Sequence, residues 1–112
     1  MQLHFSKYHG AGNDFVMIDN REGVFGEITV EKIQKICDRH MGVGGDGIIL
    51  LEHADTADFR MRYFNADLGD ETMCGNGTRC IVAFAQELGI IQNKANFQGK
   101  DGMYEAEILS EG

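Results

Sequence analysis

The residues best suited to chemistry in this sequence form the heptapeptide Met-Cys-Gly-Asn-Gly-Thr-Arg at positions 73–79. A helix-forming segment, residues 81–87, follows it directly, so Cys74 is expected at the N-terminus of a helix. There the unpaired backbone N–H groups and the positive end of the helix dipole favour a thiolate, and can lower a cysteine pKa from about 8.5 towards neutrality. Gly75 and Gly77 leave neighbouring amides uncovered, so a carboxylate could bind across them. This spacing predicts an anion site beside a group that exchanges a proton.

Three ordered motifs in the chain resemble those of the diaminopimelate epimerase family. They are Phe-Asn-Ala-Asp at 64–67 with the heptapeptide at 73–79, His-Gly-Ala-Gly-Asn-Asp-Phe at 9–15, and Asp-Arg-His at 38–40 followed by the glycine-rich residues 42–47. They occur in the family's order over nearly the whole chain, and three ordered motifs are far more specific than one. The resemblance implies an isomerase that inverts the α-carbon of LL- or meso-diaminopimelate, in the biosynthesis of lysine and cell-wall precursors.

The resemblance also implies roles for particular residues. Cys74 corresponds to the first of two catalytic cysteines, and Gly75 and Asn76 correspond to the substrate-binding residues beside it. Asn13 and Asn65 correspond to further substrate contacts, although on local pattern alone each could simply close a turn through side-chain bonds to the backbone. The family's reaction uses no pyridoxal phosphate, metal or nucleotide, so no cofactor and no metal ligand is expected. Some relatives have a substrate-binding Gln where this chain has Gly47, and that contact is not transferred.

The fold implied by the resemblance is α+β, with a mostly antiparallel or mixed sheet curled around a central helix. Family members contain two such lobes, with the active site between them. We expect residues 1–112 to form a single N-terminal lobe, with the C-terminal lobe and the second cysteine absent from this chain. Alone, the chain is then expected to have little or no epimerase activity. Two copies could also pair as a homodimer that brings their Cys74 helices face to face.

Local patterns predict the elements that hold these motifs. We expect a hairpin from a first strand at residues 3–6 and a second at 15–19, with residues 9–14 as its loop. Thr29 is expected to cap a helix from about Val30 to His40. The remaining predictions are strands at 48–51 and 58–65, a central helix that ends at Gly89, and strands at 93–98 and 103–109. Cys37 and Cys80 fall on apolar faces and are expected in the core.

The glycine-rich residues 42–47 also match the pattern G-x-G-x-x-G of dinucleotide-binding proteins. That pattern must follow a strand and open a helix, because the pyrophosphate binds at the helix N-terminus. Here a predicted helix precedes it and the apolar segment 48–51 follows it. We therefore interpret residues 42–47 as a helix C-cap and a connection into the sheet.

The composition argues against several classes of function. The chain has 112 residues, 43% hydrophobic and 25% charged, which are ordinary values for one globular domain. Its formal net charge of −8 opposes binding to nucleic acid or to an anionic membrane surface. The first residues lack the apolar core of a signal peptide, and the three cysteines are an odd number. We expect a cytoplasmic protein with reduced thiols and a small amino-acid substrate.

Other functions remain open at this point. Proline racemase relatives use the same fold but have His after Cys-Gly, so Asn76 favours the epimerase; other amino-acid racemases of this fold are not separated by the sequence. The chain could instead be a non-catalytic binding lobe in which Cys74 is a buried thiol. Reactivity distinguishes these, because a depressed pKa would make Cys74 alkylate faster than Cys37 and Cys80.

Overall fold

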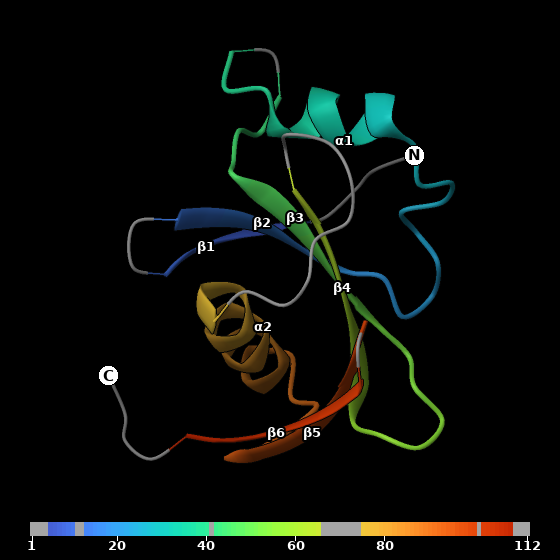
Figure 1. Ribbon diagram of the computed structural model, residues 1–112, viewed down its shortest axis with the longest axis vertical. Coiled ribbons are helices and arrows are strands. Elements are labelled where there is room, and N and C mark those ends of the chain that lie inside the picture. Colours follow the sequence, from blue (N-terminus) through green and yellow to red (C-terminus); the bar gives the residue numbers. More distant parts are fainter. Residues whose placement is uncertain (1–4, 11–12, 41, 66–74, 101, 109–112) are drawn as a thin grey trace.

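The structure is a computed structural model that describes residues 5–10, 13–40, 42–65, 75–100 and 102–108 (Figure 1). In chain order its elements are β1 (Ser6–Gly10), β2 (Asn13–Asp19), α1 (Val30–Cys37), β3 (Gly47–Glu52), β4 (Phe59–Asn65), α2 (Gly75–Glu87), β5 (Lys94–Gly99) and β6 (Gly102–Glu107). The strands form one sheet in the order β1-β2-β3-β4-β5-β6. The pairs β2–β3 and β4–β5 are parallel and the other three are antiparallel. The expected α+β fold with a mixed sheet is confirmed.

Each helix lies in one of the two parallel crossovers and covers one face of the sheet. The sheet curls around α2, which contacts β1, β2 and β3 (Figure 1). Helix α1 packs on the opposite face, where its contacts are with β3. No helix among the described residues is long and apolar enough to cross a membrane.

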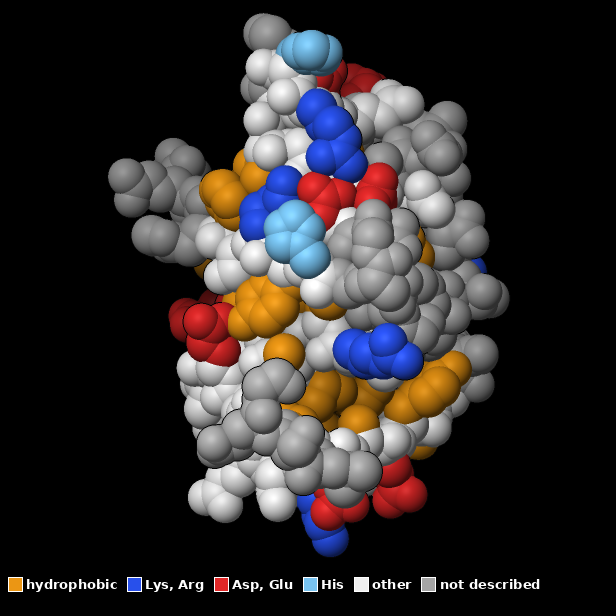
Figure 2. Space-filling view, turned by 90° about the vertical axis from the view of Figure 1, so that its left-hand side faces the viewer, with side chains coloured by type: hydrophobic (Ala, Val, Ile, Leu, Met, Phe, Trp, Pro, Cys, Tyr) orange, Lys and Arg blue, Asp and Glu red, His pale blue; other side chains and the backbone are white. Residues whose placement is uncertain are grey.

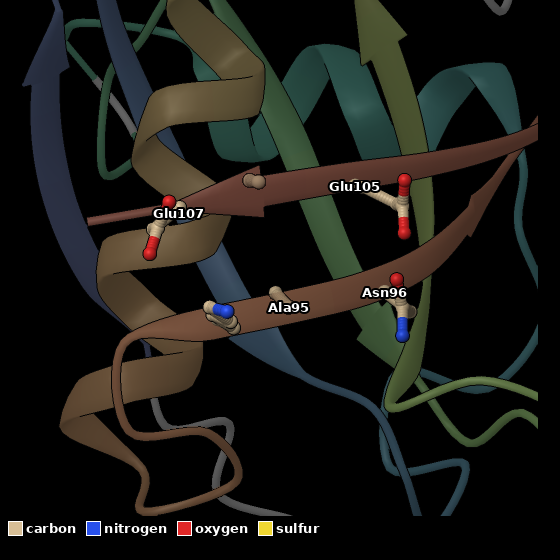
Figure 3. A pocket seen from close by; sticks show the side chains of 6 residues that line it. Ala95, Asn96, Glu105 and Glu107 are labelled. Carbon is tan, nitrogen blue, oxygen red and sulfur yellow. The ribbon is translucent and has the colours of Figure 1, made fainter. Parts of the chain in front are cut away.

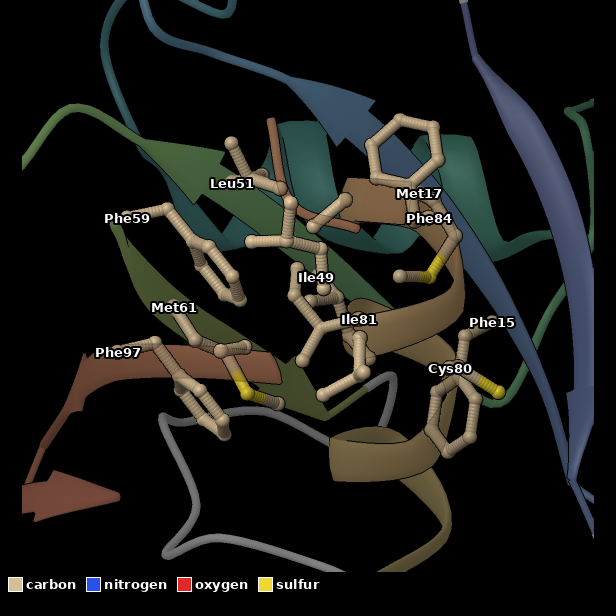
Figure 4. Packing of buried hydrophobic residues seen from close by; sticks show 14 residues of the cluster. Phe15, Met17, Ile49, Leu51, Phe59, Met61, Cys80, Ile81, Phe84 and Phe97 are labelled. Carbon is tan, nitrogen blue, oxygen red and sulfur yellow. The ribbon is translucent and has the colours of Figure 1, made fainter. Parts of the chain in front are cut away.

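The core consists of two hydrophobic clusters, one on each face. Phe15 and Met17 of β2 belong to the cluster under α2, whereas Val16 and Ile18 belong to the cluster under α1. Alternate residues of a strand point to opposite faces, so a strand covered on both sides needs an unbroken apolar run. The run Ile48–Leu51 in β3 follows the same rule. Figure 4 shows the cluster under α2, in which Ile81 of the helix meets Ile49.

Helix α1 begins as predicted and ends earlier than predicted. The Thr29 side chain accepts a hydrogen bond of 3.1 Å from the Lys32 backbone N–H, so the predicted N-cap is confirmed. The extension to His40 is wrong, because the helix ends at Cys37. The backbone N–H groups of Gly44 and Gly45 donate to the carbonyls of Ile36 and Cys37. The glycine-rich residues 42–47 thus bond to the last helical carbonyls and lead into β3, which confirms the predicted connection, whereas the C-cap residue itself is Asp38.

The β1–β2 hairpin is confirmed, but its predicted bounds are wrong. Pairing continues through His9 with Asp14 to Gly10 with Asn13, so most of the predicted loop lies in strands. Cross-strand pairing and side-chain contacts outweigh the weak strand preference of these residue types. Of the predicted first strand, residues 3–4 lie outside the described residues, Phe5 is exposed before β1, and Ser6 opens it.

The second half of the chain follows the sequence prediction closely. Helix α2 closes at Gly89, which has a φ of +80°, and the Ile90 N–H donates to the Ala85 carbonyl. Cys37 and Cys80 are both buried, as expected. Strands β5 and β6 form an antiparallel hairpin that ends at the pair Gly99 and Gly102. Each lies within two residues of its predicted bounds.

Candidate functional site

The predicted substrate contacts Asn13 and Asn65 come from strands on either side of β3. The first residue of β3, Gly47, pairs with Phe15 of β2 on one side and with Asn65 of β4 on the other. Asn13 begins β2, two residues before Phe15. We call Asn13, Gly47 and Asn65 the site edge. Sheet pairing therefore brings together residues that are far apart in the sequence.

The start of α2 packs against the sheet close to this edge. Gly77 is buried, and a Cβ atom placed on it would lie 3.3 Å from Ile49 Cδ1, 3.5 Å from Met61 Cε and 3.9 Å from Phe15 Cζ. The missing side chain allows the first turn of the helix to approach the sheet closely. Gly75 and Asn76 are the first two residues of that turn. Cys74 immediately precedes them and lies outside the described residues.

Tyr63 is a further residue of this region, to which the sequence analysis assigned no role of its own. It lies two positions before Asn65 in β4, on the same face of the strand. Its ring packs edge-on against Phe15, with the ring centroids 5.8 Å apart. A Cβ atom on Gly47 would lie 2.6 Å from Tyr63 Cε1 and 2.9 Å from the Phe64 carbonyl oxygen. The Tyr63 ring thus occupies the space above Gly47, and the local signal for this was a glycine at the start of a buried strand.

A second feature beside the site edge is an ion cluster formed by Lys7, Asp14, Arg39 and Asp46, which we call the Asp14 cluster. The Arg39 guanidinium donates two hydrogen bonds to the Asp14 carboxylate, of 3.1 and 3.0 Å, and a third of 3.2 Å to Asp46. Lys7 Nζ lies 3.1 Å from the Asp14 carboxylate and donates to the Gly44 carbonyl at 2.8 Å. The cluster joins β1 and β2 to the connection between α1 and β3.

Backbone bonds reinforce the Asp14 cluster. The Asp14 N–H donates to the Asp46 carboxylate at 3.0 Å, and the Asp46 N–H donates to the Asp14 carbonyl at 2.8 Å. The hydrogen bonds from Arg39 hold the pKa of the Asp14 carboxyl well below its usual range, against the opposing effect of burial, and Lys7 adds to the lowering. Asp14 therefore stays ionised at physiological pH. The sequence analysis had assigned no role of its own to Asp14.

Figure 2 shows the face of the molecule that lies on the left in Figure 1. Histidine, basic and acidic side chains gather in its upper half, and most of the hydrophobic side chains in view lie in its middle and lower parts, with further charged side chains at the lower end. A charged region and an apolar region therefore adjoin on this face.

Two hollows elsewhere in the described structure do not involve the predicted site residues. One, of about 330 Å³, lies on β5 and β6, where Asn96, Glu105 and Glu107 line an exposed face (Figure 3). The other, of about 150 Å³, lies where β4 separates from β5 and is lined in part by Arg60, Arg62 and Lys100. Among the described residues, no three His, Cys, Asp or Glu side chains are grouped as ligands for a metal ion.

Comparisons with known proteins place these features in a family context. Residues 5–112 match the family model described as diaminopimelate epimerase. The chain is 54% identical over 102 residues to a diaminopimelate epimerase of Flavobacterium psychrophilum, covering 91% of this chain and 40% of that protein. It is 51% identical over 104 residues to the diaminopimelate epimerase of Chlorobaculum tepidum, with the same two coverages. The chain thus spans about 40% of the length of these relatives.

A solved structure with a similar fold is a phenazine biosynthesis protein of the PhzF family from Bacillus anthracis. Its TM-score is 0.67 at 23% sequence identity, and the match covers 97% of this chain and 36% of that one. A PhzF-family protein of Enterococcus faecalis has a TM-score of 0.63 at 19% identity, over 98% of this chain and 41% of that one. At these identities the likeness concerns the fold alone.

Proposed function

This chain belongs to the diaminopimelate epimerase family, and from this premise we propose that it forms the N-terminal lobe of a cofactor-independent diaminopimelate epimerase. The observation that carries the proposal is the meeting of the family's motifs at one end of the curled sheet. There the site edge lies beside the first turn of α2, and that turn begins one residue after Cys74. The substrate that we propose is LL- or meso-diaminopimelate.

The proposed mechanism assigns Cys74 to one side of the substrate. Inversion requires that the α-proton leave from one face and that a proton arrive on the other. The Cys74 thiolate, favoured by the start of α2, accepts the α-proton, while a thiol on the opposite side delivers its own proton to the same carbon. One proton enters and one leaves, so the two sulfur atoms exchange protonation states in each turnover.

The other predicted residues bind the substrate in this proposal. Backbone N–H groups at Gly75 and Asn76 receive the α-carboxylate, as uncovered amides at a helix start do. The side-chain amides of Asn13 and Asn65 hold the amino-acid group at the distal end, since each can donate and accept hydrogen bonds. The binding groups then come from both sides of β3 and from α2.

The second thiol comes, in this proposal, from a C-terminal lobe outside these 112 residues. The span of about 40% of the relatives' length supports this, as do the hydrophobic side chains visible on the face in Figure 2. A homodimer with two Cys74 helices face to face is the other arrangement. Sedimentation at high protein concentration distinguishes these two arrangements, because a chain that remains monomeric cannot supply the second thiol itself. We place the protein in the cytoplasm, where the thiols of Cys37 and Cys80 would stay reduced.

The experiment that tests the proposal measures deuterium incorporation at the α-carbon of diaminopimelate in deuterated water. It uses this chain alone, then this chain mixed with the part of the Flavobacterium psychrophilum relative that follows the matched segment. We expect incorporation only in the mixture, and its loss in Cys74→Ala but not in the matched variant Cys37→Ala. A mixture that associates without incorporating deuterium contradicts the proposal and favours a non-catalytic binding lobe.

The same assay tests the substrate. Proline, glutamate and aspartate are offered in place of diaminopimelate, under identical conditions and with the same Cys74→Ala control. Incorporation into one of these amino acids, and none into diaminopimelate, would make the protein another racemase of this fold.

A further inference from the structure

We propose that Asp14, through its ion pairs with Arg39 and Lys7, is a positioning residue that fixes Asn13 against the start of β3 for substrate binding. This inference rests on the proposed function and deepens it, because it names the groups that hold the site edge in place. Asp14 directly follows Asn13, and Asp46 directly precedes Gly47. The Asp14 cluster therefore adjoins both of these positions without belonging to the substrate contacts.

The bonds of the cluster fix the start of β2 and the start of β3 relative to each other. Arg39 bridges the two carboxylates, and each carboxylate-bearing residue also donates its backbone N–H to the other. A two-pronged bond between arginine and a carboxylate adds directional specificity that a single point charge does not have. These bonds consequently hold the start of β2 against the segment that precedes β3. Lys7 adds a third attachment, from β1 to the Gly44 carbonyl.

The exposure of these groups argues that stability is not the main effect of the cluster. The Arg39 side chain is 56% exposed and that of Asp46 is 40% exposed, whereas that of Asp14 is only 13% exposed. Ion pairs that reach solvent to this degree contribute little to the free energy of folding. A group that contributes little to stability yet makes contacts on three segments is well suited to setting local geometry.

A matched pair lies at the other end of the same strand. Asp19 ends β2, and its carboxylate accepts two hydrogen bonds from the Arg21 guanidinium, of 2.8 and 2.7 Å. That pair has the same chemistry as the pair of Asp14 and Arg39 but lies away from the site edge. Asp19→Asn therefore controls for the loss of an aspartate–arginine pair in β2.

The test compares Asp14→Asn, Arg39→Lys and Asp19→Asn in the reconstituted mixture described above. We expect Asp14→Asn to raise the KM for diaminopimelate by about tenfold or more while kcat changes less, since misplaced binding groups weaken binding first. Arg39→Lys keeps the positive charge but loses the pair of hydrogen bonds to Asp14, and we expect it to raise KM as well. Asp19→Asn should leave both constants unchanged. If Asp14→Asn does not fold, Arg39→Lys against Asp19→Asn decides the question.

A second readout needs no activity. Amide hydrogen exchange on the chain alone should speed up at Asp14 and Asp46 in Asp14→Asn by about tenfold, with Ile81 in the core of α2 unchanged. An unchanged KM in a folded Asp14→Asn, or an equal rise in Asp19→Asn, overturns the inference and leaves the proposed function standing. A wild-type mixture that associates but incorporates no deuterium overturns both.

Discussion

Burial decides the chemistry of two of the three cysteines. Cys37 lies in the cluster under α1 and Cys80 in the cluster under α2, with 6% and 3% of their surfaces exposed. Burial raises the pKa of the Cys37 thiol to about 11. At physiological pH the Cys37 thiol is therefore neutral and reacts slowly with electrophiles. Because both side chains are buried, Cys37 and Cys80 provide the internal reference for any measurement on Cys74.

Alkylation rates follow from this difference. In the folded chain at pH 8, we expect Cys37 to react with iodoacetamide roughly 100-fold more slowly than an exposed thiol, because so little of it is ionised. Cys74 should react faster than either buried cysteine if the proposed function is correct. Peptide mass spectrometry over a time course measures all three rates, and labelling in urea should make them equal. Slow labelling of all three in the folded chain would count against Cys74 as a base.

Gly47 lies so close to Tyr63 and to the Phe64 carbonyl oxygen that no side chain would fit at this position. The Phe64 carbonyl oxygen is backbone, so it cannot move away from an added Cβ atom as a flexible side chain would. We expect Gly47→Ala to lower the free energy of unfolding by about 1 to 3 kcal/mol. The matched variant Gly45→Ala should cost less, since its nearest neighbour is Val16 Cγ2 at 3.2 Å, a side-chain atom. Urea unfolding of both variants measures the difference, and equal costs would refute the steric account.

At the level of elements, β1 is held to α2 by one aromatic side chain. The Tyr8 ring packs edge-on against Phe84, with centroids 5.8 Å apart, and its hydroxyl donates a hydrogen bond to the Glu87 carboxylate. Burial, and next the bond to Glu87, raise the pKa of the Tyr8 hydroxyl. Because β1 is an edge strand of the sheet, this contact attaches that edge of the sheet to α2.

The raised pKa of Tyr8 predicts how the stability of the protein changes at alkaline pH. Because the pKa of Tyr8 is higher in the folded state, its contribution to stability is complete below about pH 10 and is lost as the pH rises further. We expect Tyr8→Phe to cost about 0.5 to 1 kcal/mol at pH 7. The gap between the two proteins should narrow at high pH. Thermal unfolding from pH 7 to pH 11 tests this, and a gap that stays constant would show that the hydroxyl titrates alike in both states.

At the scale of the molecule, the Asp14 cluster connects three segments and gives the chain an acid-sensitive contact. The groups that face Asp14 are Lys7 and His9 from β1, and Arg39 and Asp46 from the connection between α1 and β3. Because the pKa of Asp14 is lower in the folded state, its contribution is present above about pH 4 and is lost as the pH falls. The contribution itself is modest, since Arg39 is largely exposed.

Acid unfolding measures that contribution. We expect the wild-type chain to be more stable than Asp14→Asn at pH 7, and the difference to shrink as the pH falls from about 5 to 2. Unfolding midpoints of the two proteins in urea across this range give the result. A difference that is the same at pH 7 and pH 2 would show that ionisation of Asp14 does not stabilise the fold.

The sequence alone determined the parts of this protein that depend on near neighbours. The Thr29 cap, the Gly89 turn that follows α2 and the buried run of β3 follow from periodicity and from residues a few positions apart. The order of the motifs likewise indicated the family and its α+β fold. For the predicted site residues, the sequence identified candidates and their types, and the roles of Cys74, Asn13, Asn65, Gly75 and Asn76 stay predictions.

Only the tertiary structure decided what meets across the sheet. Arg39 reaches Asp14 from 25 positions away, and Asp46 reaches it from 32. The position of the Tyr63 ring above Gly47 also depends on strands that meet only after folding. Short-range patterns carry no information on such contacts, because their energies arise between residues that the chain separates widely. The pairing of β2, β3 and β4 is what turns separate motifs into one site edge.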